Sequence, residues 1–395
     1  MISNEKILAG LDKSAKKAQV CKKWFHENPE LSLKEEKTSE KILEIVKSYN
    51  LPYEMVGDYG IIARLEGKNS AKTVMLRADI DALPVKESPD NLKVKKLAVS
   101  KNEGVSHACG HDAHIAILLG AMDELCSVKD EINGTVLFVF EQAEETGSGI
   151  MPMLKALSKY KIDTCYGTHV YAGLKAGKIS LQPGKRMAAI TSFEIQINGK
   201  GGHVSRPDLT INPLMCAANI LVNINNIWTN EVDPTKTVTM GMATMHCGEK
   251  SNVIADYATF GGSMRYYDVQ EGKKAFESLK RVCECVAQAH RCTVEYKRIF
   301  EAPYIVNNDE QRSKVAIDGL TSLLGSEVIG ECPPWFATES MSLYLAKYPG
   351  VFAFLGIEDV ENGFGAGHHT KEFDMSDDVL KLGVAACVKY TVDSL

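Results

Sequence analysis

Apolar runs that fit buried strands alternate with helical patterns along the first 185 positions of the chain. Residues 135–140 (TVLFVF) are continuously apolar and rich in β-branched and aromatic side chains, which is typical of a strand covered on both faces. The same criteria predict strands at residues 61–65, 73–76 and 164–169 and helices at residues 113–125 and 151–158. This alternation predicts an α/β domain with a mostly parallel central sheet flanked by helices.

The pattern changes after residue 185. Residues 193–198 (FEIQIN) alternate between apolar and polar positions, as in a strand with one face in water. The later predicted elements are strands at residues 237–243, 258–265, 293–298 and 351–355 and helices at residues 212–228, 271–290 and 377–395. We therefore expect an α+β domain of residues 186–298, inserted into a larger domain formed by residues 1–185 and 299–395.

The composition is that of an ordinary globular protein. Of the 395 residues, 45% are hydrophobic and 24% charged, and the formal net charge is −6. This acidic balance gives no indication of a nucleic-acid partner. No apolar stretch approaches the ~20 residues that cross a bilayer, and the first residues (MISNEKILAG) lack a signal-peptide core, so no membrane partner is expected. Eleven cysteines without a repeating framework predict reduced thiols and a cytoplasmic location.

Residues 106–114 (SHACGHDAH) contain the densest group of metal-binding side chains. Cys109 and His111 lie two positions apart, and a thiolate with an imidazole at this spacing suits Zn, Mn, Co or Ni. Asp112 is placed to orient an imidazole without binding metal itself. His107 and His114 are more typical of structural histidines. A loop with an incidental free cysteine is the alternative interpretation.

Carboxylates follow two of the predicted buried strands. Asp79 and Asp81 follow the strand predicted at residues 73–76, at alternate positions. Aspartates at the end of a strand either contribute to a ligand site or cap a helix. Glu144 and Glu145 follow TVLFVF, and adjacent carboxylates there are costly unless a cation is present. One of the two can bind a metal while the other holds an attacking water.

Two further histidines extend this set. His169 ends the predicted strand at residues 164–169, and His369 lies in GAGHHTKEFD at residues 365–374. A single histidine at a strand end is usually structural. Here, complementary ligands follow four strands whose ends are expected to converge, which favours a shared site.

In this combination the clusters resemble the amidohydrolase branch of the aminoacylase and carboxypeptidase-G-like dinuclear metallopeptidases. That branch includes N-acyl-amino-acid amidohydrolases, hippurate hydrolases, auxin–amino acid conjugate hydrolases and N-acetyldiaminopimelate deacetylases. The matching stretches span nearly the whole chain in family order, at residues 26–32, 77–84, 104–114, 140–147, 167–170, 199–203, 252–254 and 365–374.

The resemblance implies two divalent metal ions per subunit, which would be Mn, Zn, Co or Ni. The implied ligands are Cys109, His111, Glu145, His169 and His369, with Cys109 as the thiolate that bridges the metals. Glu144 would be the general base and acid, and Asp81 and Asp112 would support the ligands from behind. His369 is preferred to His368 because it lies four residues before Phe373, as the family histidine does.

The resemblance also implies that the inserted domain is a ferredoxin-like lid and dimerisation domain. His203, Asn252 and Arg265 match positions that in relatives bind the substrate carboxylate or the developing oxyanion, often from the partner subunit. The guanidinium of Arg265 is a two-pronged donor suited to a carboxylate, although a solvated strand residue is the alternative. A homodimer or homotetramer is therefore expected.

The expected activity is hydrolysis of the amide bond of small N-acyl amino acids, with an acetyl, benzoyl or similar acyl group. The alternatives are a dipeptidase or aminopeptidase of the same architecture, a non-catalytic metal-binding homologue, and a thiol enzyme that uses Cys109 with His111. Two motifs depart from the family: FQPAEE reads FEQAEE at residues 140–145, and GxEDF reads ATESM at residues 337–341. The second departure affects the expected acyl or side-chain preference, not the metal chemistry.

Overall fold

The computed structural model describes residues 2–69 and 72–395, which form two compact units. The larger unit contains the chain up to Gly184 together with Val306–Pro333 and Glu339–Leu395. The smaller unit contains Lys185–Ile305 and Pro334–Thr338. The smaller unit extends beyond residue 298, where the insertion was expected to end, because strand β13 (Thr293–Ala302) continues past that position.

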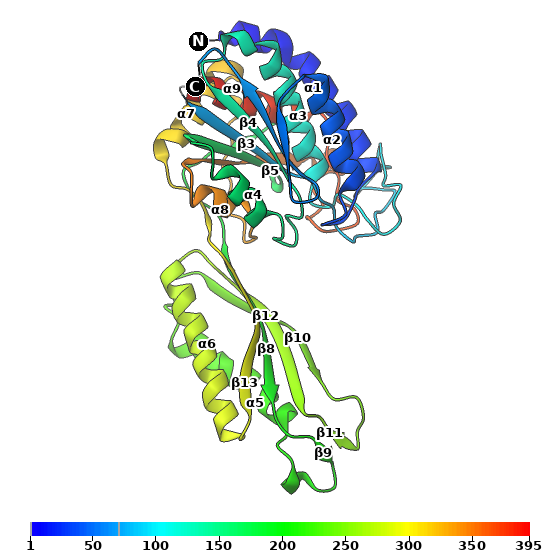
Figure 1. Ribbon diagram of the computed structural model, residues 1–395, viewed down its shortest axis with the longest axis vertical. Coiled ribbons are helices and arrows are strands. Elements are labelled where there is room, and N and C mark those ends of the chain that lie inside the picture. Colours follow the sequence, from blue (N-terminus) through cyan, green and yellow to red (C-terminus); the bar gives the residue numbers. More distant parts are fainter. Residues whose placement is uncertain (1, 70–71) are drawn as a thin grey trace. The chain divides into compact units, whose positions relative to one another are not determined.

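A seven-stranded mixed sheet forms the centre of the larger unit (Figure 1). Its order is β1-β2-β4-β3-β5-β15-β6, with β4, β3, β5 and β15 parallel in the centre and antiparallel pairs at both edges. The parallel arrangement predicted from the sequence therefore holds for the central strands. The strands are β1 (Tyr53–Val56), β2 (Gly60–Glu66), β3 (Thr73–Asp79), β4 (Thr135–Glu141), β5 (Thr164–Lys175), β6 (Ile179–Ser180) and β15 (Gly350–Glu358).

Helices α3 (His111–Ser127) and α9 (Val379–Ser394) pack on the central strands, and α1 (Asn4–Glu27) packs on both helices (Figure 1). Both α3 and α9 are buried along nearly their whole length, so their side chains share one apolar core with the sheet. Among the described residues, no helix is long and apolar enough to span a membrane. The other helices of this unit are α2 (Glu36–Ser48), α4 (Ile150–Leu157), α7 (Glu310–Leu324) and α8 (Met341–Leu345).

The smaller unit is built as strand, helix, two strands, helix, strand. Its four-stranded sheet has the order β10-β12-β8-β13 with all pairs antiparallel, which is the ferredoxin-like arrangement. Helices α5 and α6 share an apolar core with the buried face of β8. The elements are β8 (Ala189–Asn198), α5 (Pro213–Asn230), β10 (Val238–Cys247), β12 (Tyr257–Tyr266), α6 (Val269–Ala289) and β13, with short strands β9 (Gly202–His203) and β11 (Val253–Ile254). The short strands β7 (Gly184–Met187) and β14 (Ile305–Asn307) each include residues of both units.

Candidate active site

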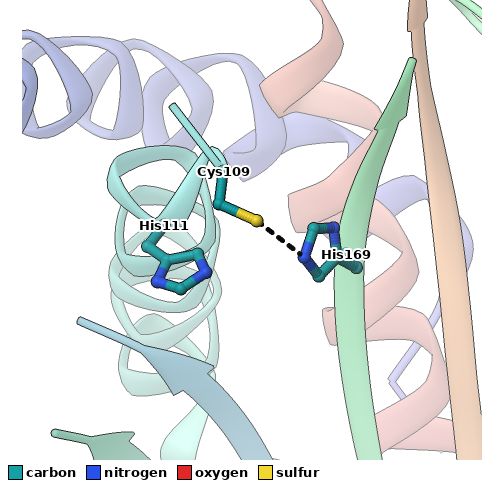
Figure 2. A group of neighbouring side chains, drawn as sticks. All are labelled: Cys109, His111 and His169. Atoms are coloured by element: carbon teal, nitrogen blue, oxygen red, sulfur yellow. Dashed lines mark hydrogen bonds between the residues drawn. The ribbon is translucent and has the colours of Figure 1, made fainter. Parts of the chain in front are cut away.

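The turn before α3 carries two of the expected ligands to the carboxyl end of the parallel strands. Gly110, directly before the helix, has a left-handed backbone conformation with φ 86°. A Cβ atom on Gly110 would lie 2.4 Å from Cγ2 of Val170, so packing as well as backbone conformation requires glycine. This turn places Cys109 and His111 opposite His169 of strand β5 (Figure 2).

Cys109 and His169 face each other across this space (Figure 2). The Sγ atom of Cys109 lies 3.6 Å from Nε2 of His169. Because Nδ1 of His169 donates to the carbonyl oxygen of Val170 at 2.6 Å, Nε2 presents a lone pair to the sulfur. Burial lowers the pKa of His169 and raises the pKa of the Cys109 thiol. The imidazole is thus in its ligating form, whereas a thiolate at this depth needs a nearby cation.

His111 and Glu145 present unpaired atoms to each other. Nε2 of His111 lies 3.7 Å from Oε1 of Glu145, and neither buried atom has a hydrogen-bond partner among the described residues. Although burial opposes it, the carboxylates of Asp79 and Asp81 raise the pKa of His111, so the site favours a positive charge here. Unpaired buried nitrogen and oxygen atoms in an acidic environment fit a divalent cation between them.

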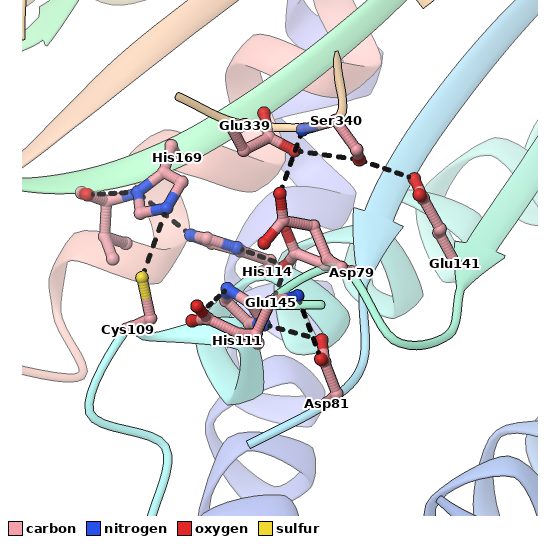
Figure 3. A network of polar contacts seen from close by, with 12 residues as sticks. Asp79, Asp81, Cys109, His111, His114, Glu141, Glu145, His169, Glu339 and Ser340 are labelled. Atoms are coloured by element: carbon pink, nitrogen blue, oxygen red, sulfur yellow. Dashed lines mark hydrogen bonds and ion pairs between the residues drawn. The ribbon is translucent and has the colours of Figure 1, made fainter. Parts of the chain in front are cut away.

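Asp81 forms hydrogen bonds with both His111 and Glu145 (Figure 3). Its Oδ1 atom accepts from Nδ1 of His111 at 3.2 Å, and its Oδ2 atom accepts the backbone N–H of Glu145 at 3.1 Å. Asp112 contacts a different residue: its Oδ2 atom lies 2.8 Å from Nδ1 of His26. Asp81 therefore touches two expected ligands directly, whereas Asp112 anchors the start of α3 to α1.

His369 approaches the same carboxylate from the C-terminal loop. Its Nε2 atom lies 3.5 Å from Oε1 of Glu145, and its backbone N–H donates to the Ala108 carbonyl at 2.8 Å. The backbone of His369 has φ 64°, which is unfavourable for any residue other than glycine. Such strained backbone conformations cluster at functional sites. The neighbouring His368 is half-buried, and its Nε2 atom accepts the backbone N–H of Ala172 at 3.3 Å. The geometry favours His369 as the ligand.

The expected ligands form overlapping sets. Within each set, one donor atom per residue lies within 4.8 Å of the others, and the sets are Cys109–His111–His169, Cys109–Glu145–His369 and His111–Glu144–Glu145. Because Cys109 and Glu145 each occur in two sets, the sets form one contiguous cluster. A cluster with shared thiolate and carboxylate ligands suits two neighbouring divalent ions.

A fourth set, Asp79–His111–His114, is a support and not a further metal site. Nε2 of His114 accepts the backbone N–H of Val170 at 3.0 Å. Its Nδ1 atom therefore carries the proton and donates to Oδ1 of Asp79 at 2.6 Å. With both nitrogens engaged, His114 ties strand β3 to strand β5 beside His169, which agrees with its expected structural role.

Glu144 lies beside the cluster at the end of a strained turn. Ala143 before it has φ 51°, and the backbone N–H of Ala143 donates to buried Glu35 at 2.7 Å. Oε1 of Glu144 accepts the backbone N–H of Ser340 at 2.9 Å. Burial, followed by the charges of Glu339 and Glu145, raises the pKa of Glu144 well above its usual value. A carboxyl group in this environment keeps its proton to higher pH than an exposed one does.

The three expected substrate-binding residues lie in the smaller unit. His203 in β9 pairs with Val253 in β11, and the adjacent Asn252 accepts the backbone N–H of Val204 through its carbonyl at 3.3 Å. Arg265 in β12 is half-buried and donates from Nη1 to the hydroxyl of Thr338. Arg265 is therefore not a freely solvated strand residue, and His203 and Asn252 lie next to each other on the surface of this unit.

Comparison with known proteins identifies the family. The model of peptidase family M20/M25/M40 matches residues 75–392 of the chain. The chain belongs to this family. The resemblance inferred from the motifs is thereby confirmed, and the mixed sheet with its flanking helices is the M20 fold.

Several M20 relatives share a substantial part of their sequence with this chain. Thermostable carboxypeptidase 2 of Saccharolobus solfataricus is 35% identical over 92% of this chain and 91% of its own length. N-acetylcysteine deacetylase of Bacillus subtilis is 32% identical over 87% and 88%. The N-acyl-L-amino acid amidohydrolase of Geobacillus stearothermophilus is 33% identical over 73% and 77%. The solved YXEP protein of Bacillus subtilis, a dinuclear metal binding peptidase, has a TM-score of 0.79 and 27% identity, and covers 97% of this chain and 99% of that one.

A second group of buried polar residues, centred on Arg77, lies beside the candidate ligands and was not identified from the sequence. Arg77 is buried and contacts the carboxylates of Asp79, Glu141 and Glu339. The sequence does indicate that Arg77 has buried partners, because it is a charged residue between Leu76 and Ala78 in a buried strand. No local pattern indicates that residues near position 340 supply them.

Proposed function

We propose that the chain is a metal-dependent amidohydrolase that cleaves the amide bond of small N-acyl amino acids into a carboxylic acid and a free amino acid. The observation that carries this proposal is Glu144 beside the unpaired atoms of His111 and Glu145. A site that only bound metal would not need this additional carboxylate. The deacetylase and amidohydrolase relatives support N-acyl amino acids as the substrate class.

Two divalent ions, which would be Mn, Zn, Co or Ni, are the proposed cofactors. The ligand donors are Cys109, His111, Glu145, His169 and His369, a thiolate, imidazole and carboxylate set that these metals accept. When bound, such ions polarise a carbonyl group and make water a better nucleophile. The unpaired atoms of His111 and Glu145 are the part of the structure that fits them best.

Glu144 is the proposed general base and acid. One of its oxygens, Oε1, is held by the backbone N–H of Ser340, so we assign the proton transfer to Oε2. This oxygen would take a proton from the attacking water and deliver it to the leaving nitrogen. The raised pKa of Glu144 suits the second of these steps, because the acid form must persist long enough to protonate the amine.

Substrate recognition is assigned to His203, Asn252 and Arg265. The guanidinium of Arg265 presents two parallel donors that match the carboxylate of an amino acid. His203 and Asn252 offer an imidazole and an amide for the acyl oxygen as it gains negative charge. We further propose that these residues act across a homodimer or homotetramer. Eleven free cysteines support a reducing, cytoplasmic location.

The alternative chemistries differ in what they require of Cys109. A nucleophilic cysteine needs a lowered pKa, whereas burial raises the pKa of this thiol. The structure therefore disfavours a thiol enzyme. Cleavage of peptides is the second candidate, because relatives that are 35% identical to the chain are named carboxypeptidases.

A release assay separates these substrate classes. Purified protein freed of metal would be supplied with Mn²⁺, Zn²⁺, Co²⁺ or Ni²⁺ in turn and offered N-acetyl amino acids, N-benzoyl amino acids and unblocked dipeptides. The proposal predicts amine release mainly from the acylated amino acids and only with added metal. Preferential release from dipeptides would replace it with the peptidase alternative, and full turnover in a metal-free sample would exclude both.

A further inference from the structure

Arg77 forms the centre of a buried polar cluster next to the proposed base. Its guanidinium lies 2.7 Å from Oδ2 of Asp79, 2.8 Å from Oε2 of Glu141 and 2.6 Å from Oε1 of Glu339. All four side chains are almost completely buried. Because one cation faces three carboxylates, every remaining donor in this cluster matters for its geometry.

Ser340 supplies such a donor beside Glu141 and Glu339 (Figure 3), and it also reaches Glu144. The hydroxyl oxygen of Ser340 accepts from Nη2 of Arg77 at 2.6 Å, and the hydroxyl donates to Oε2 of Glu141 at 3.1 Å. Its backbone N–H donates to Oε1 of Glu144 at 2.9 Å. One residue thus connects the Arg77 cluster, through its side chain, to the proposed base, through its main chain.

The segment that carries this N–H is irregular backbone held by individual hydrogen bonds, among them those from the backbone N–H groups of Ser342 and Leu343 to the carbonyl oxygens of Glu339 and Ser340. Residues 337–339 are in neither helix nor strand, and helix α8 begins only at Met341. Glu144 meanwhile lies among the like charges of Glu339 and Glu145, which repel its carboxylate. A fixed donor at Ser340 counteracts this repulsion and determines which oxygen of Glu144 stays free.

We propose that Ser340 is a positioning residue for the hydrolytic reaction: its hydroxyl, held between Arg77 and Glu141, fixes the main-chain N–H that orients Glu144. This inference rests on the proposed role of Glu144 as the base. Ser340 does not touch the substrate or the metals in this scheme. It acts on turnover only through the orientation of the Glu144 carboxylate.

The chemistry of the contact explains why residues 141 and 340 belong together. A hydroxyl both accepts and donates, so it can bridge a guanidinium and a carboxylate, whereas a carboxylate at position 340 could only accept. An aspartate at 340 would therefore oppose Glu141, unless residue 141 were an amide able to donate. Two of the departures from the family motifs, glutamate at 141 and serine at 340, are the acceptor and the donor of this hydrogen bond.

The test is steady-state kinetics of the metal-loaded full-length enzyme, with its best N-acyl amino acid substrate, for four variants and a matched control. The variants are Ser340→Ala, Ser340→Thr, Ser340→Asp and the double variant Ser340→Asp/Glu141→Gln. The control is Ser342→Ala, because the buried hydroxyl of Ser342 has no hydrogen-bond partner among the described residues. Metal content is measured for each protein.

We expect Ser340→Ala to lower kcat about 10- to 100-fold relative to Ser342→Ala, with KM and metal content nearly unchanged, a part of what general acid–base catalysis contributes. Ser340→Thr should retain most of the turnover. Ser340→Asp should be the poorest single variant, and Glu141→Gln should restore it to within a few-fold of the native enzyme.

A kcat for Ser340→Ala equal to that of Ser342→Ala would overturn the inference. So would a double variant no better than Ser340→Asp. If Ser340→Ala does not fold, the comparison of Ser340→Asp with the double variant decides the question. The other levels are tested separately: absence of N-acyl amino acid turnover by the metal-loaded native enzyme removes the proposed function, and native turnover by Glu144→Gln removes the proposed base. Inactivity of Glu144→Gln together with a normal Ser340→Ala removes only the role of Ser340.

Discussion

The Oδ1 atom of Asp81 lies 3.2 Å from Nδ1 of His111, and this contact decides which nitrogen of the imidazole faces the proposed metals. Because a carboxylate accepts, Nδ1 carries the proton and Nε2 keeps its lone pair. The second oxygen of Asp81 is also occupied, by the backbone N–H of Glu145 at 3.1 Å and by the hydroxyl of Ser32 at 2.6 Å. One buried carboxylate thus orients two of the proposed ligands.

Replacement of Asp81 should weaken metal binding although Asp81 is not a ligand. For Asp81→Ala we expect a loss of about 10- to 100-fold in metal affinity, because both His111 and Glu145 lose their orienting partner. Calorimetric titration of the metal-free protein with metal measures this affinity. Ser32→Ala is the matched comparison, since it removes a contact to Asp81 but none to a ligand. Native affinity in Asp81→Ala would show that the ligands hold their positions without it.

Cys109 should resist alkylation both with and without bound metal. A coordinated thiolate is engaged at its lone pair, and in the metal-free state burial keeps Cys109 protonated and slow to react. Treatment with iodoacetamide, followed by peptide mass spectrometry, should therefore leave Cys109 unmodified in the metal-loaded enzyme, while exposed Cys285 reacts in the same sample. Rapid modification of Cys109 with metal present, accompanied by loss of turnover, would instead indicate a free nucleophile.

Arg77 should be important for stability as well as for the site. Replacement by methionine leaves the buried carboxylates of Asp79, Glu141 and Glu339 without their cation, which should lower the free energy of unfolding by about 3–5 kcal/mol. The control is Arg64→Met, which removes a more exposed pair with Glu66 and should cost less than about 1 kcal/mol. Urea unfolding measures both, and equal losses would show that the Arg77 cluster contributes no more than a surface pair.

His26 should make stability depend on pH above neutrality. Burial opposes its charged form, but hydrogen bonds to Asp112 and Glu87 outweigh this and raise its pKa from 6.5 to about 9. The charged imidazole therefore stabilises the fold fully below pH 6.5, and this contribution is lost as the pH rises through 9. The difference in unfolding free energy between native protein and His26→Gln, measured without metal, should shrink by about 3 kcal/mol between pH 6 and pH 10. A pH-independent difference would show that His26 is neutral in the fold.

The sequence predicted the elements well because their burial is regular. Every predicted helix and strand is present, with ends that differ by a few residues. A continuous apolar run such as TVLFVF is stable mainly when it is buried, which makes its place in the fold predictable. Strand β5 runs to Lys175 and not to residue 169, since its second half pairs with β15 after the apolar run has ended. Helix α7 (Glu310–Leu324) was not predicted, because its apolar positions are spread among charged ones.

The candidate site was predictable to the extent that its residues lie in dense local motifs. Cys109 and His111, or Glu144 and Glu145, are close in the chain and stand out together. The support around them is long-range: Ser340 lies 196 positions from Glu144, and His26 lies 86 positions from Asp112. The periodicity of apolar positions along the chain carries no information about contacts between distant residues. Only the folded structure shows them.

Metal content and turnover of a Glu144→Gln variant, measured on one preparation, test the central claim most directly. The five proposed ligands are intact in this variant, so it should bind two divalent ions per chain, as the native protein should. Its turnover of N-acyl amino acids should fall by about 10²–10⁴-fold, the usual contribution of a general acid–base residue. Native turnover in the metal-loaded variant would contradict the assignment of Glu144, and native turnover in a metal-free sample would contradict the dinuclear mechanism altogether.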